Sequence, residues 1–209
     1  MRLNRPLDKI LNNEAKVRAL RILCRNPDGM SGRQIAKMAG VTPKTAHGIL
    51  QDLLREGVLV MRTVGKTYLF SLNEERAVVK DVLKGLFAAE NTLSAKLFGI
   101  IRTAVKKSRL KDNILSVAVF GSVHAGTERP ESDVDLFVIV RTARLKPEAE
   151  GLFFEIDQKL SPKWGNLISP YVNTADEFKS NAKKKTGVVP GILKSYRLIY
   201  GERLEKLLR

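Results

Sequence analysis

The sequence contains one cysteine and two histidines among its 209 residues, and this scarcity excludes several kinds of site. Cys24 has no partner for an internal disulfide. The histidines and cysteine are too few to build a zinc cluster. A Walker-type phosphate loop and a serine-protease-like triad are absent as well. Cys24 stands among apolar residues at helical spacing, which favours a buried thiol over a catalytic one.

Long apolar runs are also missing. No stretch approaches the roughly 18 apolar residues of a membrane-spanning helix. The opening segment MRLNRPLDKILNNEAKVR lacks the apolar core and small-residue cleavage site of a secretory signal. Hydrophobic residues make up 44% of the chain and charged residues 28%, as in ordinary globular proteins. We therefore expect a cytoplasmic protein.

Acidic residues are in the minority. The chain has 37 Lys and Arg against 22 Asp and Glu, a formal net charge of +15. The excess is uneven: residues 1–75 hold 13 basic against 7 acidic residues, residues 76–110 hold 8 against 2, and residues 111–209 hold 16 against 13. A basic balance of this size favours polyanionic partners, nucleic acid above all, although a merely solvated basic surface is the alternative.

Changes in pattern divide the chain into three parts. Residues 1–73 combine helices with a hairpin, residues 74–110 are helical and form a linker or the start of a second domain, and residues 111–209 alternate strands with helices. The expected fold class is α+β, with a small mixed sheet in the last part.

Helix-breaking and helix-capping residues divide residues 13–72 into three expected helices and a hairpin. In chain order the signals are the breakers Asn26–Gly29, the Ser31–Gln34 capping box, Gly40, the Thr42-Pro43 helix start, Gly57 and the Gly65-Lys66 turn.

This order of elements resembles the winged helix-turn-helix domain of prokaryotic transcriptional regulators. In such a domain the exposed N-terminal residues of the third helix face base edges in the major groove, and the hairpin meets phosphates or the minor groove. Double-stranded DNA is therefore an expected partner. The candidate contacts are Arg33, Thr42, Lys44, Thr45, His47, Gln51, Arg62 and Lys66. A protein-interaction module is the alternative.

Residues 74–109 show a broad apolar stripe at helical spacing. Gly85 or Asn91-Thr92 offers a place where this helix can break in two. The wide apolar face can also serve dimerisation, and helix-turn-helix regulators often read two half-sites, so a homodimer is a further expectation.

Two short motifs follow in the last part of the chain. Gly121-Ser122 ends an apolar strand, and Asp133-Val134-Asp135 opens another after ten intervening residues. Glycine lets the backbone approach a phosphate closely, and a serine at a helix start offers a hydroxyl and an N–H. Because side chains alternate along a strand, Asp133 and Asp135 share one side while Val134 packs inward. Two neighbouring carboxylates suit Mg²⁺.

This pattern resembles the DNA polymerase β superfamily, and in length the minimal nucleotidyltransferases. The resemblance implies that Gly121, Ser122, Asp133 and Asp135 bind ATP or another nucleoside triphosphate. It also implies that Asp133 and Asp135 are the catalytic ligands of Mg²⁺ or Mn²⁺.

One departure from that family concerns a third carboxylate, which its catalytic members usually carry on the next strand. The corresponding run Leu167–Val172 has no acid. The nearest are Glu155 and Asp157 before it and the capping-box residues Asp176 and Glu177 after it. We therefore expect a DNA-binding transcriptional regulator whose second domain binds nucleotide with weak or no turnover. The alternatives are an active transferase that moves a nucleoside monophosphate to a protein, nucleic-acid or small-molecule acceptor, and a purely structural role for both domains.

Overall fold

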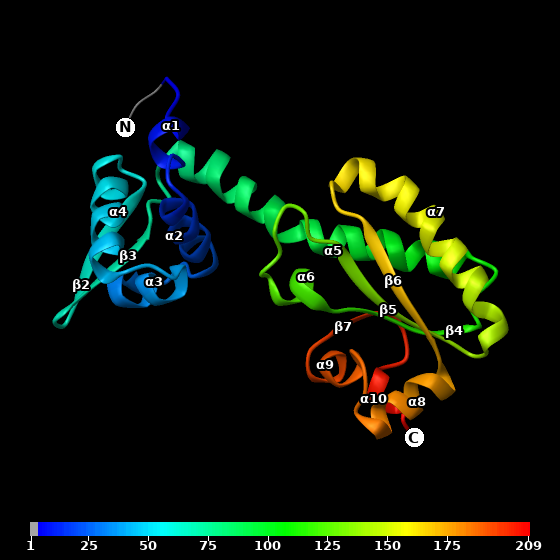
Figure 1. The fold of residues 1–209 in the computed structure, drawn as a ribbon. Coiled ribbons are helices and arrows are strands. Elements are labelled where there is room, and N and C mark those ends of the chain that lie inside the picture. Colours follow the sequence, from blue (N-terminus) through cyan, green and yellow to red (C-terminus); the bar gives the residue numbers. More distant parts are fainter. Residues whose placement is uncertain (1–3) are drawn as a thin grey trace. The chain divides into compact units, whose positions relative to one another are not determined.

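The computed structural model describes residues 4–209 and divides the chain between Leu93 and Ser94 into two compact units, each with its own core (Figure 1). We call residues up to Leu93 unit 1 and residues from Ser94 unit 2. None of the helices in the described region is long and apolar enough to cross a membrane.

Unit 1 packs a group of short helices against a three-stranded antiparallel sheet of order β1-β3-β2. Its elements are α1 (Leu7–Ile10), α2 (Glu14–Arg25), β1 (Met30–Ser31), α3 (Gly32–Ala39), α4 (Pro43–Arg55), β2 (Leu59–Val64) and β3 (Thr67–Leu72).

Local capping explains where the helices of unit 1 begin and end. Ser31 and Gln34 form both hydrogen bonds of a capping box at the start of α3, which ends at Gly40 in the left-handed conformation. Thr42 caps α4, and Pro43 occupies its first turn. The helix-turn-helix and hairpin predicted from the sequence are thus confirmed. The short helix α1 was not predicted, and its Ile10 is buried in the same core.

The helical segment that follows contributes apolar side chains to the cores of both units. A π-helical turn η1 (Val78–Leu83) leads into α5 (Lys84–Lys107), which continues without a break through Gly85 and Asn91. Leu83 and Phe87 are buried in the core of unit 1, where Arg21 also forms two hydrogen bonds with Glu90 of 2.6 and 2.8 Å. Later residues of α5 are buried in the core of unit 2.

Unit 2 is built on a four-stranded sheet of order β6-β5-β4-β7, in which only β5 and β6 run parallel. It is the small mixed sheet expected from the sequence. Its elements are β4 (Ile114–Val119), α6 (Gly121–Ala125), β5 (Val134–Val140), η2 (Ala143–Leu145), α7 (Lys146–Trp164), β6 (Ile168–Thr174), α8 (Ala175–Lys184), α9 (Val189–Lys194), β7 (Arg197–Gly201) and α10 (Leu204–Leu207).

Helices cover both faces of this sheet (Figure 1). Alternate residues of β5, among them Val134 and Val138, pack with α5 and α7 on one face. Phe137 and Ile139 face the other way and pack with α8, α9 and α10. Because both faces are covered, β5 is apolar at nearly every position. Asp135 is the exception, and it stands where the strand begins.

Candidate functional site

The turn after β4 brings the two motifs of unit 2 together. The N–H of Phe120 donates to the Asp135 carbonyl oxygen at 3.1 Å, which joins the end of β4 to the start of β5. Gly121 follows with a φ of +72°, and a Cβ placed on it would lie 2.3 Å from Oδ2 of Asp135. Only glycine therefore fits between this turn and the Asp135 carboxylate.

Asp133 and Asp135 flank Val134, whose side chain is buried in the core on the opposite face of β5. Asp133 is exposed and Asp135 is half-buried. The pKa of Asp135 is raised, mainly because burial disfavours its charged form and further because Asp133 lies nearby. Within residues 4–209, no side chain pairs with or donates a hydrogen bond to either carboxylate. Two closely placed carboxylates without a cationic partner fit a divalent cation.

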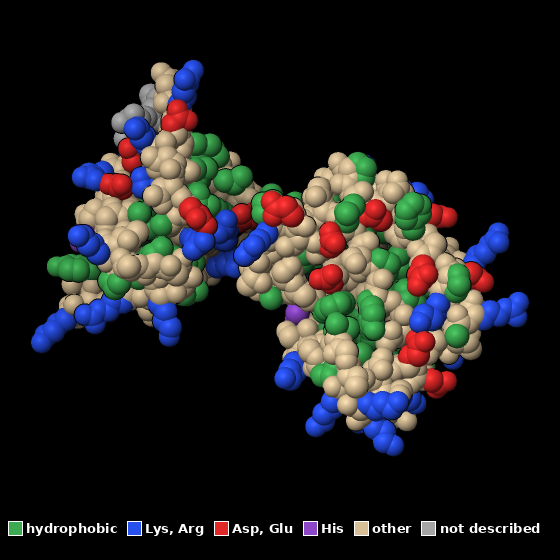
Figure 2. Space-filling model, in the orientation of Figure 1, with side chains coloured by type: hydrophobic (Ala, Val, Ile, Leu, Met, Phe, Trp, Pro, Cys, Tyr) green, Lys and Arg blue, Asp and Glu red, His purple; other side chains and the backbone are tan. Residues whose placement is uncertain are grey.

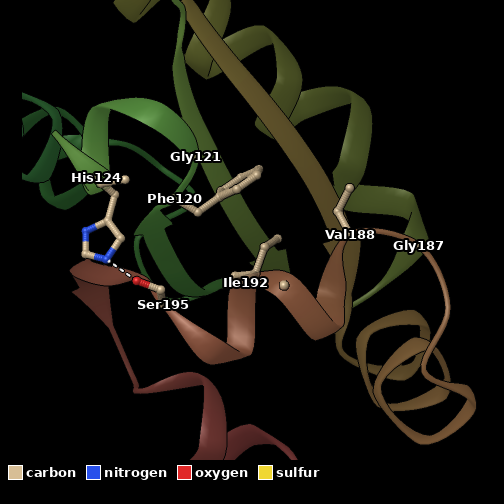
Figure 3. A pocket seen from close by; sticks show the side chains of 9 residues that line it. Phe120, Gly121, His124, Gly187, Val188, Ile192 and Ser195 are labelled. Atoms are coloured by element: carbon tan, nitrogen blue, oxygen red, sulfur yellow. Dashed lines mark hydrogen bonds between the residues drawn. The ribbon is translucent and has the colours of Figure 1, made fainter. Parts of the chain in front are cut away.

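A cavity of about 430 Å³ opens beside the same turn. Its walls come from the turn and α6 on one side and from the segment of α9 on the other (Figure 3). Gly121 belongs both to this wall and to the contact with Asp135. At one end Nε2 of His124 lies 3.0 Å from Oγ of Ser195. Ser195, the residue that caps the end of α9, and the cavity residues of α9 were not predicted as site residues, because they stand about 70 positions after the motif and no spacing rule links them to it.

In unit 1 the expected DNA-contacting side chains lie at the start of α4. Thr42, Lys44, Thr45 and His47 are exposed, and Gln51, one turn further on, is half-buried. The Thr42 hydroxyl accepts the N–H of Thr45 at 3.1 Å and lies 2.9 Å from the Thr45 hydroxyl. Thr42 therefore serves first as a helix cap, which leaves Lys44 and His47 as the freer groups at this end of the helix.

A groove of about 600 Å³ separates α4 from the β2–β3 hairpin. It brings together Arg33 of α3, His47 of α4 and Lys66 of the hairpin turn, which lie far apart in the sequence. Arg62 stands on β2, where its guanidinium donates to the Asp28 carbonyl oxygen at 2.6 Å. Figure 2 shows Lys and Arg side chains projecting from the hairpin end of this unit.

Tyr68 also lines this groove and was not predicted. It is 57% exposed, although it shares a face of β3 with the buried Phe70. The alternation of the strand could have indicated this position, since Tyr68 lies beyond the core and near the hairpin tip. An exposed aromatic ring among basic side chains is a suitable contact for nucleic acid.

Comparison with family models assigns both units. The model described as "Winged helix-turn-helix DNA-binding" matches residues 12–60, and the model described as "Polymerase beta, Nucleotidyltransferase" matches residues 101–203. The chain joins a winged helix-turn-helix domain to a domain of the polymerase β nucleotidyltransferase family. The second match contains the whole motif from Gly121 to Asp135.

Among solved structures, part of the chain is similar to a solution structure from Mycobacterium bovis. That structure is described as a homodimeric winged helix-turn-helix DNA-binding domain of a possible ArsR-family transcriptional regulator. The similarity has 21% sequence identity and a TM-score of 0.34, and it covers 44% of this chain and 77% of that one. No curated protein matches the chain.

The nucleotidyltransferase domain has no third carboxylate beside its aspartate pair. Ser169 is the residue of β6 in register with Asp135. Asp157 is buried, and its Oδ1 accepts the N–H of Ile168 at 2.7 Å, so it joins α7 to β6. Glu177 takes part in the capping box at the start of α8, and its carboxylate accepts a hydrogen bond from the Lys146 ammonium. Among residues 4–209, no three or more His, Cys, Asp or Glu side chains are grouped so that they could hold a metal ion.

Proposed function

We propose that this protein is a DNA-binding transcriptional regulator whose nucleotidyltransferase domain binds a nucleoside triphosphate with a divalent metal and turns it over slowly or not at all. The observation that carries the proposal is the presence in one chain of a basic winged-helix groove and an aspartate pair beside the Gly121 turn. Nucleotide occupancy would set the affinity for DNA.

Binding of double-stranded DNA is supported by the arrangement of charge in the winged-helix domain. Arg33 and Lys66 border the groove, and Lys44 is exposed on the first turn of α4. Positive groups on both sides of a recognition helix match the phosphates on both sides of a major groove. His47, Thr45 and Gln51 would then face base edges.

Nucleotide binding is supported by the unpaired carboxylates and by the bare backbone at Gly121. Asp133 and Asp135 would hold Mg²⁺ or Mn²⁺ together with phosphate oxygens of ATP or another nucleoside triphosphate. The Ser122 hydroxyl, half-buried on α6, would bond a phosphate oxygen. The metal supplies positive charge against the phosphates when it is bound.

Weak turnover is supported by Ser169 at the position in register with Asp135. A serine hydroxyl does not supply the charge with which a third carboxylate would help to activate an attacking hydroxyl. Binding needs only the pair, so the missing acid lowers the rate more than the affinity. Release of pyrophosphate from ATP that depends on Asp133 and Asp135 would instead establish an active transferase.

The exposed face of α5 supports a homodimer. Leu86 and Leu93 of α5 are 46% and 50% exposed, and Val82 of the preceding π-helical turn η1 is 40% exposed. Leu86 and Leu93 are one heptad apart, the repeat by which two helices pack along an apolar seam. Two paired chains would present two recognition helices to two half-sites.

Replacing Leu86 and Leu93 with lysine should convert a dimer to a monomer, because four lysines would meet in the paired face. Light scattering coupled to size-exclusion chromatography measures the mass directly. Phe154→Lys is the matched control, since Phe154 is 64% exposed on α7 and lies outside this face. A wild-type protein that stays monomeric at every concentration tested would refute the dimer.

Asp135→Asn should raise the thermal stability at neutral pH and abolish stabilisation by ATP with Mg²⁺. A raised carboxyl pKa means that protonation stabilises the folded state at low pH, and that this stability is lost as the pH rises through the folded-state pKa. The ionised carboxylate therefore destabilises the fold at pH 7, and the neutral amide relieves that cost by about 1 kcal/mol or less.

Thermal denaturation with and without ATP and Mg²⁺ measures both effects. The wild type should gain about 2.7 kcal/mol at a nucleotide concentration 100 times Kd, and Asp135→Asn should gain nothing. Glu155→Gln, a matched change on α7 behind the other face of the sheet, should keep the full gain. Equal gains in the wild type and Asp135→Asn would place the nucleotide elsewhere.

Regulation is tested by the DNA affinity of the same proteins. Saturating ATP and Mg²⁺ should change the wild-type Kd for a duplex by at least about fivefold, the lower range of allosteric coupling. Asp135→Asn should bind DNA with the nucleotide-free affinity under both conditions. A wild-type affinity that does not change while the nucleotide is bound would exclude regulation of DNA binding by nucleotide.

A further inference from the structure

The cavity beside Gly121 differs in chemistry from the phosphate-binding motif that it adjoins. Side chains of Phe120, Val188 and Ile192 surround it, and the His124–Ser195 pair stands at one end (Figure 3). None of the described residues that line it is Lys, Arg, Asp or Glu. In a chain with 28% charged residues, an uncharged hollow of this size suits a neutral ligand group rather than a phosphate or a carboxylate.

Glycines leave bare backbone in the walls of this cavity. Gly187 and Gly191 line it, and a Cβ placed on either would meet no other atom within 4 Å. Bare backbone on one side and the ring of Phe120 among the other walls leave a space suited to a planar group. The volume of about 430 Å³ lies in the range of small-ligand sites.

We propose that this cavity receives the nucleobase of the nucleotide whose phosphates lie at Gly121 and Ser122. The inference rests on the nucleotide binding proposed above and adds the site of the base. Gly121 lines the cavity and also lies against Asp135, so the base and the phosphates of one nucleotide would meet at this residue. Phe120, Val188 and Ile192 bury the ring faces. His124 Nε2 and Ser195 Oγ, already 3.0 Å apart, exchange their mutual hydrogen bond for bonds to the polar edge of the base.

A substitution at Gly191 tests binding of the base separately from binding of the phosphates. Gly191 lies inside α9 with an ordinary helical φ and lines the cavity, so leucine is compatible with the helix and adds an isobutyl group at the cavity wall. Gly85→Leu is the matched control, because Gly85 lies in α5 with equally open space around it and far along the chain from the motif. Ser195→Ala removes the hydroxyl at the polar end without adding bulk.

The experiment is calorimetric titration of each full-length variant with ATP and, separately, with inorganic triphosphate, both with Mg²⁺. The wild type should bind ATP about 10- to 100-fold more tightly than triphosphate, because only ATP buries a base. Gly191→Leu should lose that difference and keep its triphosphate affinity. Ser195→Ala should lower the affinity for ATP about threefold to tenfold and leave the affinity for triphosphate unchanged. Gly85→Leu should match the wild type.

The outcomes distinguish this inference from the proposal beneath it. If neither ATP nor triphosphate binds the wild type, the nucleotide function itself fails. If both bind the wild type and neither Gly191→Leu nor Ser195→Ala changes the ATP affinity, the base lies elsewhere and the cavity proposal is overturned. An equal loss of ATP and triphosphate in Gly191→Leu overturns it as well, since the cavity would then serve the phosphates.

Discussion

Gly121→Ala should abolish Mg²⁺-dependent ATP binding while costing only moderate stability. An alanine at a φ of +72° is strained by about 1–2 kcal/mol. Its Cβ would lie 2.3 Å from Oδ2 of Asp135, a separation that forces the carboxylate to rotate away. Because that carboxylate is a proposed metal ligand, we expect the ATP affinity measured by calorimetry to fall about 100-fold or more.

Gly126→Ala isolates the effect of the Asp135 contact from that of backbone strain. Gly126 ends α6 with a φ of +69°, and a Cβ there would meet nothing within 4 Å. Both variants should therefore lose stability through backbone strain in thermal or urea denaturation, while only Gly121→Ala also displaces the Asp135 carboxylate and loses ATP affinity. Equal ATP affinities in the two variants would show that the Asp135 carboxylate does not hold the metal.

The fold of each domain was largely predictable from the sequence, because local signals mark its elements. The capping boxes at Ser31 and Thr174 form as the sequence predicts. The hairpin turn at Gly65-Lys66 joins β2 and β3, and β5 spans Val134–Val140 as the apolar run indicates. In each case the information lies within a few residues, where hydrogen bonding and side-chain alternation act directly.

Features that depend on distant residues were not predictable. No periodicity in the sequence marks the π-helical turn at Val78–Leu83. The sequence also does not predict that α5 continues through Gly85, which it does because residues on both sides of Gly85 pack into the cores. Gly85 is a poor helix former, but tertiary burial of its neighbours outweighs that preference. The meeting of His124 with Ser195 follows from the packing of α9 against the sheet, which only the folded chain shows.

The structure also gives Asp157 a definite role. From the sequence alone it was one of the nearest acids to the strand that lacks a third carboxylate. In the fold it is buried on the side of α7 and accepts a backbone N–H of β6. A buried carboxylate held by such a bond is a structural group, so it does not serve as a third ligand at the proposed metal site. The residue in register with Asp135 remains Ser169.

The second large effect concerns the groove that we propose binds DNA. Arg33→Glu combined with Lys44→Glu should lower the affinity for duplex DNA at least about 100-fold at 50 mM salt, because two proposed phosphate contacts would be replaced by repulsion. Arg33 lines the groove on α3, and Lys44 is exposed at the start of α4. A random-sequence duplex suffices, since phosphate contacts do not depend on base sequence. Fluorescence anisotropy over a salt series measures the affinity and its slope.

The chain has a net charge of +15, which attracts DNA without regard to any particular site. The experiment must therefore distinguish the effect of where the substituted charges lie from the effect of the change in total charge. Lys159→Glu with Lys163→Glu changes the net charge by the same amount at two exposed positions on α7. That control should lose only a few-fold affinity and keep the wild-type salt slope. The groove variant should also reduce the slope of log K against log salt by about 2, one unit for each lost contact. Equal losses in the two double variants would mean that DNA is held by diffuse charge, and the winged-helix groove would then not be its binding site.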